Sequence, residues 1–531
     1  MTPKSTLILV TCVALCGSKG ALSDNVLVVP GEYSHWLNMR AMLEELVNRN
    51  HSVTVLVNSA SPTVDYTRLE RFHFEVFQVP FSKCQLHGIS EELIRFWIYN
   101  ASDASVMEIA SKVIEVTSQA TPLQMQACDA MLRNKELQDK LRRGSFHVLL
   151  SDPMIQCGDL LAEALGIPLI YSLRFSFGYT IERFCGQLPV PASYVPAAPL
   201  QYSDRMSFVE RLTNVLMYAF HTSFFHIYSI VNWNRYYSDF LGRPTTVCDV
   251  MGKADVWLIR TYWDFEYPRP LLPNFQFVGG LHCKPAKPLP SDIEEFVQSS
   301  GDAGIVVISF GTLIPNLTRD KGNVIASALG QIPQKVLWKY SGEKPDTLAP
   351  NTRVYDWLPQ NDLLGHPKTR AFVTHGGTNG IYEAIYHAVP MVGIPMFSDQ
   401  PDNMARMRNK GAAVVLDFNT MRSKDLVDAL NTVINVPSYK ESVTRLSRIH
   451  HDQPMKPLDR AVFWIEFVMR NKGAKHLRVQ AHNLTWFQYH SLDVLAVLLC
   501  SAALALYTFL KTCKYCFRLC CQKSKAKNKT E

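Results

Sequence analysis

The feature that most constrains this fold is an alternation of short apolar segments with amphipathic ones on both sides of a proline-rich joint. Residues 25–29 are apolar and end at Pro30-Gly31, and an apolar periodicity of three and four follows as far as residue 47. That periodicity predicts a helix facing a core. A second apolar segment occupies residues 52–57. Strand, helix and strand within roughly 35 residues form a βαβ unit, so the sheet is expected to be parallel.

The alternation continues through residues 146–150 and 167–172, and it resumes after the joint at residues 284–290. The strands expected beyond the joint are 305–309, 336–339, 353–355, 371–374, 391–394 and 413–416. The pattern predicts an α/β protein with two doubly wound domains facing across a cleft, and ligands at the carboxyl ends of the strands. We place the domains at residues 24–284 and 285–450, with bracing helices at 451–490.

Both ends of the chain carry membrane-targeting patterns. Residues 1–23 have the three-part pattern of a signal peptide. The apolar segment 491–510 is close to the length that spans a bilayer, and the basic tail 511–531 predicts the cytosolic side. The tail contains seven basic residues and one acidic residue, which accounts for +6 of the net charge of +7. Because the positive charge is concentrated in the tail and is not spread over a folded face, it argues against nucleic-acid binding. Lys527 and Lys529 match a retrieval signal of the endoplasmic reticulum, so we expect a single-pass type I protein with its bulk in the lumen.

Cysteines and glycosylation sequons give weaker expectations. The cysteines of the lumenal part are scattered without metal-type spacing, and we expect buried free thiols: Cys84, Cys128, Cys157, Cys185, Cys248 and Cys283. Four sequons lie in the same part, at Asn50, Asn100, Asn316 and Asn483.

The stretch 173–243 interrupts the alternation and is rich in aromatic residues. Three interpretations stay open: helical core, a pocket for an apolar acceptor, or a face that rests on a bilayer. The candidates for lining an acceptor pocket are Phe175, Phe177 and Phe208.

The densest set of functional candidates lies between residues 357 and 403. Trp357 offers a flat surface for stacking a uracil base, and Gln360 offers a donor and an acceptor for its edge. Glu383 can accept hydrogen bonds from both ribose hydroxyls.

Phosphate and sugar contacts are expected at the ends of strands. Thr374, His375, Gly376 and Gly377 connect a strand to a helix that starts near Thr378 and Asn379, where backbone N–H groups attract phosphate. Asp399 and Gln400 can bind sugar hydroxyls, and Ser309 and Gly311 form a second loop suited to phosphate or sugar.

This constellation resembles the signature of UDP-sugar-dependent glycosyltransferases. Residues 251–260, 277–288 and 484–490 are similar to vertebrate UDP-glucuronosyltransferases, and look closest to the family 2 branch that handles steroids, phenols and odorants. The resemblance implies a GT-B fold and an inverting transfer from UDP-glucuronate to a small lipophilic acceptor. Homo- or hetero-oligomers are also expected from the family.

In that family a histidine just after the first strand is the catalytic base, and His35 occupies this place. Asp152 matches the carboxylate that orients the base, as in a catalytic triad. Arg260 matches an arginine that meets the diphosphate. We expect no metal or other cofactor, since the chain lacks the Asp-x-Asp triplet that holds a metal-bound nucleotide sugar.

Other functions have to be weighed against this one. The same fold could use UDP-glucose, UDP-galactose or UDP-N-acetylglucosamine, or the chain could be a silent lumenal partner of an active relative. The silent partner predicts loss of His35, Asp152 or the Trp357–Gln360 pair, and all are present. A dinucleotide-dependent oxidoreductase would need Gly-x-Gly-x-x-Gly after the first strand, where this chain has a single glycine.

Overall fold

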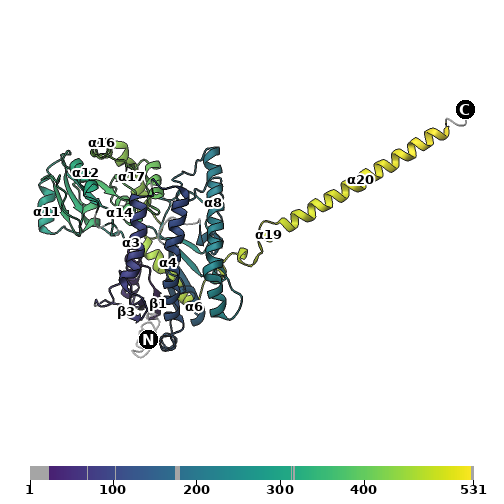
Figure 1. Ribbon diagram of the computed structural model, residues 1–531, viewed down its shortest axis with the longest axis horizontal. Coiled ribbons are helices and arrows are strands. Elements are labelled where there is room, and N and C mark those ends of the chain that lie inside the picture. The colour runs from purple at the N-terminus through teal and green to yellow at the C-terminus, as the bar shows by residue number, and fades with distance from the viewer. Residues whose placement is uncertain are drawn as a thin grey trace, which may run out of the picture. The chain divides into compact units, whose positions relative to one another are not determined.

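The computed structural model describes residues 23–68, 70–101, 103–173, 180–312, 314 and 317–527 (Figure 1). The chain forms two compact units, of which one ends at Leu477 and the other begins at Arg478. Apart from Ser23, the predicted signal peptide lies outside the described residues.

The first domain is built on a seven-stranded sheet whose order is β3-β2-β1-β4-β5-β6-β7. Every neighbouring pair in it is parallel, so the carboxyl ends of its strands share one edge. Val29 lies opposite Ser151, which brings the turns that follow β1 and β4 together. The strands are β1 (Asn25–Val29), β2 (Ser52–Asn58), β3 (His73–Phe77), β4 (Val148–Ser151), β5 (Leu169–Leu173), β6 (Val256–Ile259) and β7 (Phe275–Phe277).

Helices cover both faces of this sheet, and each face has its own buried apolar cluster. Side chains alternate across a strand, so Leu27 enters one cluster while Val26 and Val28 enter the other. The helices are α2 (Ser34–Asn48), α3 (Lys83–Tyr99), α4 (Val106–Leu132), α5 (Lys135–Arg143), α6 (Gly158–Leu165), α7 (Ile181–Phe184), α8 (Phe208–Tyr228), the π-helical η1 (Ser229–Asn234), α9 (Arg235–Leu241) and α10 (Val247–Met251).

The second domain has a six-stranded sheet of order β10-β9-β8-β11-β12-β13, again wholly parallel. Its strands are β8 (Ile305–Ser309), β9 (Lys335–Lys339), β10 (Thr352–Tyr355), β11 (Thr369–Thr374), β12 (Met391–Gly393) and β13 (Ala413–Val415). Its helices are α11 (Ser291–Gln298), α12 (Arg319–Leu329), α13 (Gln360–Leu364), α14 (Thr378–Tyr386), α15 (Gln400–Asn409), α16 (Ser423–Asn435) and α17 (Pro437–His451). The expectation of two doubly wound parallel-sheet domains is therefore confirmed.

Helix α18 (Pro457–Asn471) follows the second domain but packs on the first. Its buried residues Ala461, Ile465 and Val468 share an apolar cluster with β1 and α2. Arg49, at the end of α2, donates a hydrogen bond of 2.7 Å to Asp459. A short 3-10 turn, η2 (Lys475–Leu477), ends this unit.

The second unit contains η3 (Gln480–Asn483), α19 (Trp486–Tyr489) and the long helix α20 (Leu492–Lys527). Residues 492–521 of α20 are long and apolar enough to cross a membrane, and an 18-residue stretch within them has a mean hydropathy of 2.1. The helix continues beyond the predicted span 491–510 because no helix-breaking residue separates the span from the tail.

The expectation of free thiols is wrong for four of the six cysteines. Disulfides join Cys128 to Cys157 and Cys185 to Cys248, while Cys84 and Cys283 are free. Cys84 is exposed, so it is not the buried thiol that was expected. Three of the bonded cysteines belong to the apolar cluster on one face of the first sheet. The spacing of the cysteines along the chain does not show which helices pack on the same face of the sheet. The two disulfides could therefore not be predicted from the sequence.

Candidate active site

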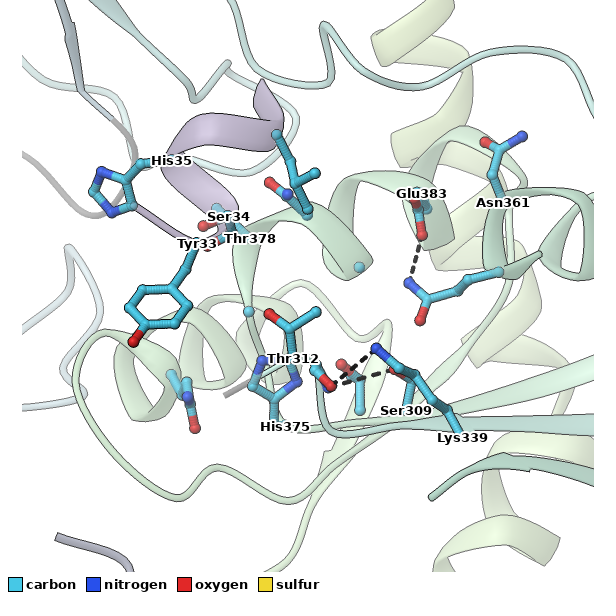
Figure 2. Close-up of a pocket in the computed structure, with 18 of the residues that line it drawn as sticks. Tyr33, Ser34, His35, Ser309, Thr312, Lys339, Asn361, His375, Thr378 and Glu383 are labelled. Atoms are coloured by element: carbon cyan, nitrogen blue, oxygen red, sulfur yellow. Dashed lines mark hydrogen bonds between the residues drawn. The ribbon is translucent and has the colours of Figure 1, made fainter. Parts of the chain in front are cut away.

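One cavity of about 950 Å³ lies between the carboxyl ends of the two sheets (Figure 2). The first domain contributes the turn after β1 and the residues after β4, including His35, Met154 and Ile155. The second domain contributes loops that follow β8, β10, β11 and β12. Because both sheets are parallel, their strand ends converge here, as expected for doubly wound folds.

His35 and Asp152 are joined by a hydrogen bond at the edge of this cavity. Nδ1 of His35 lies 2.5 Å from Oδ2 of Asp152. The His35 side chain is 16% exposed and lines the cavity, while Asp152 is fully buried behind it. A carboxylate at Nδ1 favours the tautomer whose proton sits on Nδ1, which leaves the lone pair on Nε2. This is the arrangement of a general base with its orienting carboxylate.

The Asp152 carboxylate is held as an anion by its surroundings. Burial alone would raise its pKa, but the charge and hydrogen bond of His35, the charge of Arg260 and the Met154 N–H together lower it. The Met154 N–H donates to Oδ1 at 2.9 Å. Gly31 permits this close packing, since a Cβ there would lie 2.5 Å from Asp152 Oδ2 and 2.7 Å from His35 Cβ.

The loop between β11 and α14 places His375 against two glycines. A Cβ on Gly311 would lie 2.9 Å from the His375 ring, and a Cβ on Gly377 would lie 2.6 Å from its Nε2. Gly376 has φ of 87°, a conformation that side chains disfavour. Gly377, Thr378 and Asn379 line the cavity at the start of α14, and the N-terminus of a helix is a favourable place for an anion.

Gln360 and Glu383 are joined by a hydrogen bond of 2.5 Å from the Gln360 amide to Oε2 of Glu383. Figure 2 shows Glu383 on one side of the cavity, away from His35. Burial raises the pKa of Glu383 to about 7, although the Gln360 hydrogen bond opposes the shift. Trp357 lies on the same rim and is 69% exposed, so its ring is accessible for stacking.

The start of α15 organises the remaining part of the cavity. Oε1 of Gln400 accepts hydrogen bonds from the backbone N–H groups of Met396 and Phe397, at 2.9 and 3.1 Å. Asn403 donates to Asp399 at 2.8 Å and to the Gly376 carbonyl at 3.0 Å. The Asn403 bonds connect Asp399 to the loop that carries His375, while the Gln400 bonds fix the loop that precedes α15.

The cavity collects most of the residues that the sequence singled out. Its lining includes His35, Ser309, Gly311, Trp357, Gln360, Thr374, His375, Gly377, Thr378, Asn379, Glu383, Asp399 and Gln400. Gly376 is not part of the lining; its backbone lies between His375 and Gly377. Arg260 is buried and lines a small separate cavity with Asn38, His282 and Asn379.

Of the three acceptor-pocket candidates the structure describes only Phe208, which does not line the cavity. Phe208, the first residue of α8, is 71% exposed to solvent. Phe175 and Phe177 lie outside the described residues, as does the sequon residue Asn316. The other three sequon asparagines, Asn50, Asn100 and Asn483, are exposed.

The structure adds lysines that the sequence analysis missed. Lys284, Lys287 and Lys339 line the cavity. Lys339 donates a hydrogen bond of 3.2 Å to the Gly311 carbonyl, and burial lowers the pKa of its ammonium group (Figure 2). It pairs in register with Ser309, so its place at a strand end was the available signal. In the part of the chain that the structure describes, no group of three or more His, Cys, Asp and Glu side chains is arranged to hold a metal.

Comparison with known proteins decides the family. Residues 24–527 match the family described as UDP-glucoronosyl and UDP-glucosyl transferase. The chain belongs to this family. It is similar to mouse UDP-glucuronosyltransferase 2A2, with 58% identity over 94% of each chain. It is also similar to human UDP-glucuronosyltransferase 2B15, with 55% identity over 98% of each.

As a member of this transferase family, the chain is an enzyme that transfers a hexosyl group. Solved glycosyltransferases share its GT-B fold. A UDP-glucosyltransferase from Polygonum tinctorium aligns over 85% of this chain and all of its own, with a TM-score of 0.57 and 15% identity. The calicheamicin glycosyltransferase CalG4 aligns over 85% of this chain and 99% of its own, with a TM-score of 0.55 and 17% identity.

Proposed function

We propose that this transferase moves glucuronic acid from UDP-glucuronate to a hydroxyl or amine group of a small lipophilic acceptor, giving a β-glucuronide and UDP. The observation that supports this most is that His35, hydrogen-bonded to the buried Asp152, lines the same cavity as Trp357, Gln360 and Glu383. A base and a surface suited to a nucleotide thus line one cavity.

The chemistry follows from the arrangement of the base. Nε2 of His35 takes the proton from the acceptor hydroxyl as the oxygen attacks the anomeric carbon. A new carbon–oxygen bond forms on one face of the sugar, and the bond to the UDP oxygen breaks on the opposite face. Asp152 stabilises the imidazolium that results. The configuration at the anomeric carbon is inverted in this single displacement.

Positive charge in the cavity suits a donor with three anionic groups. The N–H groups at the start of α14 face the diphosphate, and Lys284, Lys287 and Lys339 add cationic side chains. The scheme therefore uses no metal or other cofactor. Arg260 acts in it through the charge that it exerts on Asp152. The glucuronyl donor is inferred from the relatives' names, since both 2A2 and 2B15 are called UDP-glucuronosyltransferases.

We place the enzyme in the endoplasmic reticulum membrane as a single-pass type I protein with a lumenal catalytic part and a cytosolic tail. The apolar segment of α20 and the basic residues after it support this orientation. The two disulfides and the exposed asparagines Asn50, Asn100 and Asn483 fit an oxidising, glycosylating compartment.

The test is a competition among four labelled donors in microsomes that express the full chain, with a phenol and a steroid as acceptors. We expect UDP-glucuronate to be used in preference to UDP-glucose, UDP-galactose and UDP-N-acetylglucosamine. A glycoside of another sugar as the main product would refute the donor assignment and keep the fold and base. Absence of any glycoside would refute the transferase proposal and favour a silent partner.

A further inference from the structure

Four cysteines gather just beyond the apolar part of α20. Asp493 and Lys511 bracket this part, and residues 494–510 between them carry no charge. A helix rises about 1.5 Å per residue, so roughly 20 residues cross a hydrocarbon core of about 30 Å. The helix that starts at Leu492 therefore leaves such a core near Lys511. The four cysteines follow at once, and we call them the thiol cluster: Cys513, Cys516, Cys520 and Cys521.

Three of these thiols share one side of the helix, which Figure 1 shows as continuous through this region. Cys513, Cys516 and Cys520 are separated by three and four residues, the spacing that places side chains on one face. Two residues correspond to a rotation of about 200°, so side chains two positions earlier lie on the opposite face. Those positions are all basic: Lys511, Lys514 and Arg518. Thiols and positive charges are thus on separate sides of the helix.

The thiol cluster is exposed, and its members are free of disulfides. Cysteine is among the residue types that are most often buried, so four exposed thiols within nine residues are unusual. The first domain differs, since two disulfides join four of its cysteines. Thiols in the cytosol stay reduced and the thiolate is a nucleophile, so a cytosolic thiol cluster is available for covalent chemistry.

Two other uses of a thiol cluster are less well supported. A disulfide between two copies of the chain needs an oxidising compartment, which the cytosol is not. A metal site needs three or more ligands that converge, and within the residues described by the structure no such group of His, Cys, Asp and Glu is found. The side chains on one face of a single helix point outward in a row, which suits separate reactions at each thiol.

We propose that the thiol cluster is a site of S-acylation by long-chain fatty acyl groups, which rests on the cytosolic tail proposed above. A cysteine thiolate attacks the carbonyl carbon of a fatty acyl-CoA, a new carbon–sulfur bond forms, and the bond to the CoA sulfur breaks. CoA leaves as a thiolate and takes up the proton that the cysteine lost, so nothing is oxidised or reduced. Cysteines beside a membrane span are typical acceptors of this group.

The distance from the bilayer fits this modification. Cys513 lies two residues and Cys521 ten residues beyond Lys511, so the thiols are about 3–15 Å from the end of the hydrocarbon core along the helix. A long acyl chain attached there reaches back into the core. The basic side chains on the opposite face remain beside the anionic headgroups of the cytosolic leaflet. Acyl chains and charges therefore do not compete for the same face.

Thioester capture from cells that express the full chain tests the proposal. Free thiols are blocked, thioesters are cleaved with neutral hydroxylamine, and the thiols released in this way are bound to a resin. The test variant carries Cys513→Ser, Cys516→Ser, Cys520→Ser and Cys521→Ser. The matched control is Cys84→Ser, at an exposed free thiol of the first domain. The intact chain and Cys84→Ser should be captured only after hydroxylamine, while capture of the fourfold variant should fall to the level seen without hydroxylamine.

The fourfold variant should form glucuronides as well as the intact chain, since its four positions are exposed and none lines the catalytic cavity. That activity, measured in microsomes from the same cells, reports that the variant is folded. Capture that is undiminished in the fourfold variant would overturn the proposal. So would a product of twice the chain mass that a reducing agent removes, because the cluster would then join two copies.

Failure of the proposal can be separated from failure of the orientation on which it rests. Sealed microsomes are treated with hydroxylamine and then with a maleimide polymer that does not cross membranes. Addition of the polymer to the thiol cluster without any thioester capture would overturn S-acylation and keep the tail in the cytosol. If the polymer reacts with the cluster only after detergent is added, both the S-acylation and the proposed orientation are wrong.

Discussion

The side-chain amide of Asn38 donates a hydrogen bond of 2.8 Å to Oδ1 of Asn379, and this bond joins the two halves of the active site. Asn38 lies one turn after His35 on α2 and also donates to the Ser34 carbonyl at 2.9 Å. Asn379 is in the first turn of α14 and lines the cavity. The bond therefore holds the helix that carries the base against the helix that faces the donor.

Replacing Asn38 with alanine should lower kcat about 10-fold, since a buried hydrogen bond of this kind contributes about 1–2 kcal/mol and the position of His35 depends on it. The matched control is Asn48→Ala, at the exposed end of the same helix. Steady-state kinetics of both variants in microsomes checks this. Equal kcat values for Asn38→Ala and Asn48→Ala would show that the cross-cleft bond does not position the base.

Donor binding should depend on pH through Glu383. Burial raises its pKa to about 7, so the carboxyl is mostly protonated below that pH and mostly ionised above it. The ionised form accepts hydrogen bonds from ribose hydroxyls better, so KM for UDP-glucuronate should fall as pH rises through about 7. Glu383→Gln should have a higher KM and lose this pH dependence. A pH dependence that persists in Glu383→Gln would assign the titration to another group.

The ion pair between Arg406 and Glu266 should stabilise the fold around α15. Nε of Arg406 lies 3.2 Å from Oε1 of Glu266, and both side chains are buried. Removing one member of a buried pair costs about 3–5 kcal/mol, because the other charge stays buried. Arg406→Ala should therefore lower the unfolding temperature by several degrees and raise the donor KM, since α15 carries Gln400. Arg408→Ala, exposed on the same helix, should change neither. Thermal unfolding of both variants in detergent decides the point.

The strands and the site could be predicted together because one rule governs both. Buried parallel strands are short apolar runs, and the polar residues that follow them meet at one edge. Thr374 and Ser309 were located in this way without knowledge of strand order. The roles of His35 and Asp152 came from the resemblance to the family, and both residues also follow strand ends. β1 and β8 have the predicted bounds, and the other predicted strands differ at their ends by one or two residues.

The positions of other residues depend on which strands and helices pack side by side in the fold. That packing could not be predicted from the pattern of residues along one sequence. The position of Lys339 beside Ser309 requires the pairing of β8 with β9. The position of Phe208 requires the rotation of α8, since aromatic residues on a helix look alike whether they face the core or the outside. The disulfide between Cys185 and Cys248 spans 63 residues and needs the packing of α7 and α10.

The most direct test of the central claim is to measure turnover and donor binding in the same preparation of His35→Gln. Glutamine keeps a polar side chain at this position but cannot take the acceptor's proton. We predict that kcat falls about 10²–10⁴-fold, the usual contribution of a general base, while the dissociation constant for UDP-glucuronate stays within about two-fold of the unaltered enzyme. Turnover that survives the substitution with binding unchanged would contradict the assignment of His35 as the base.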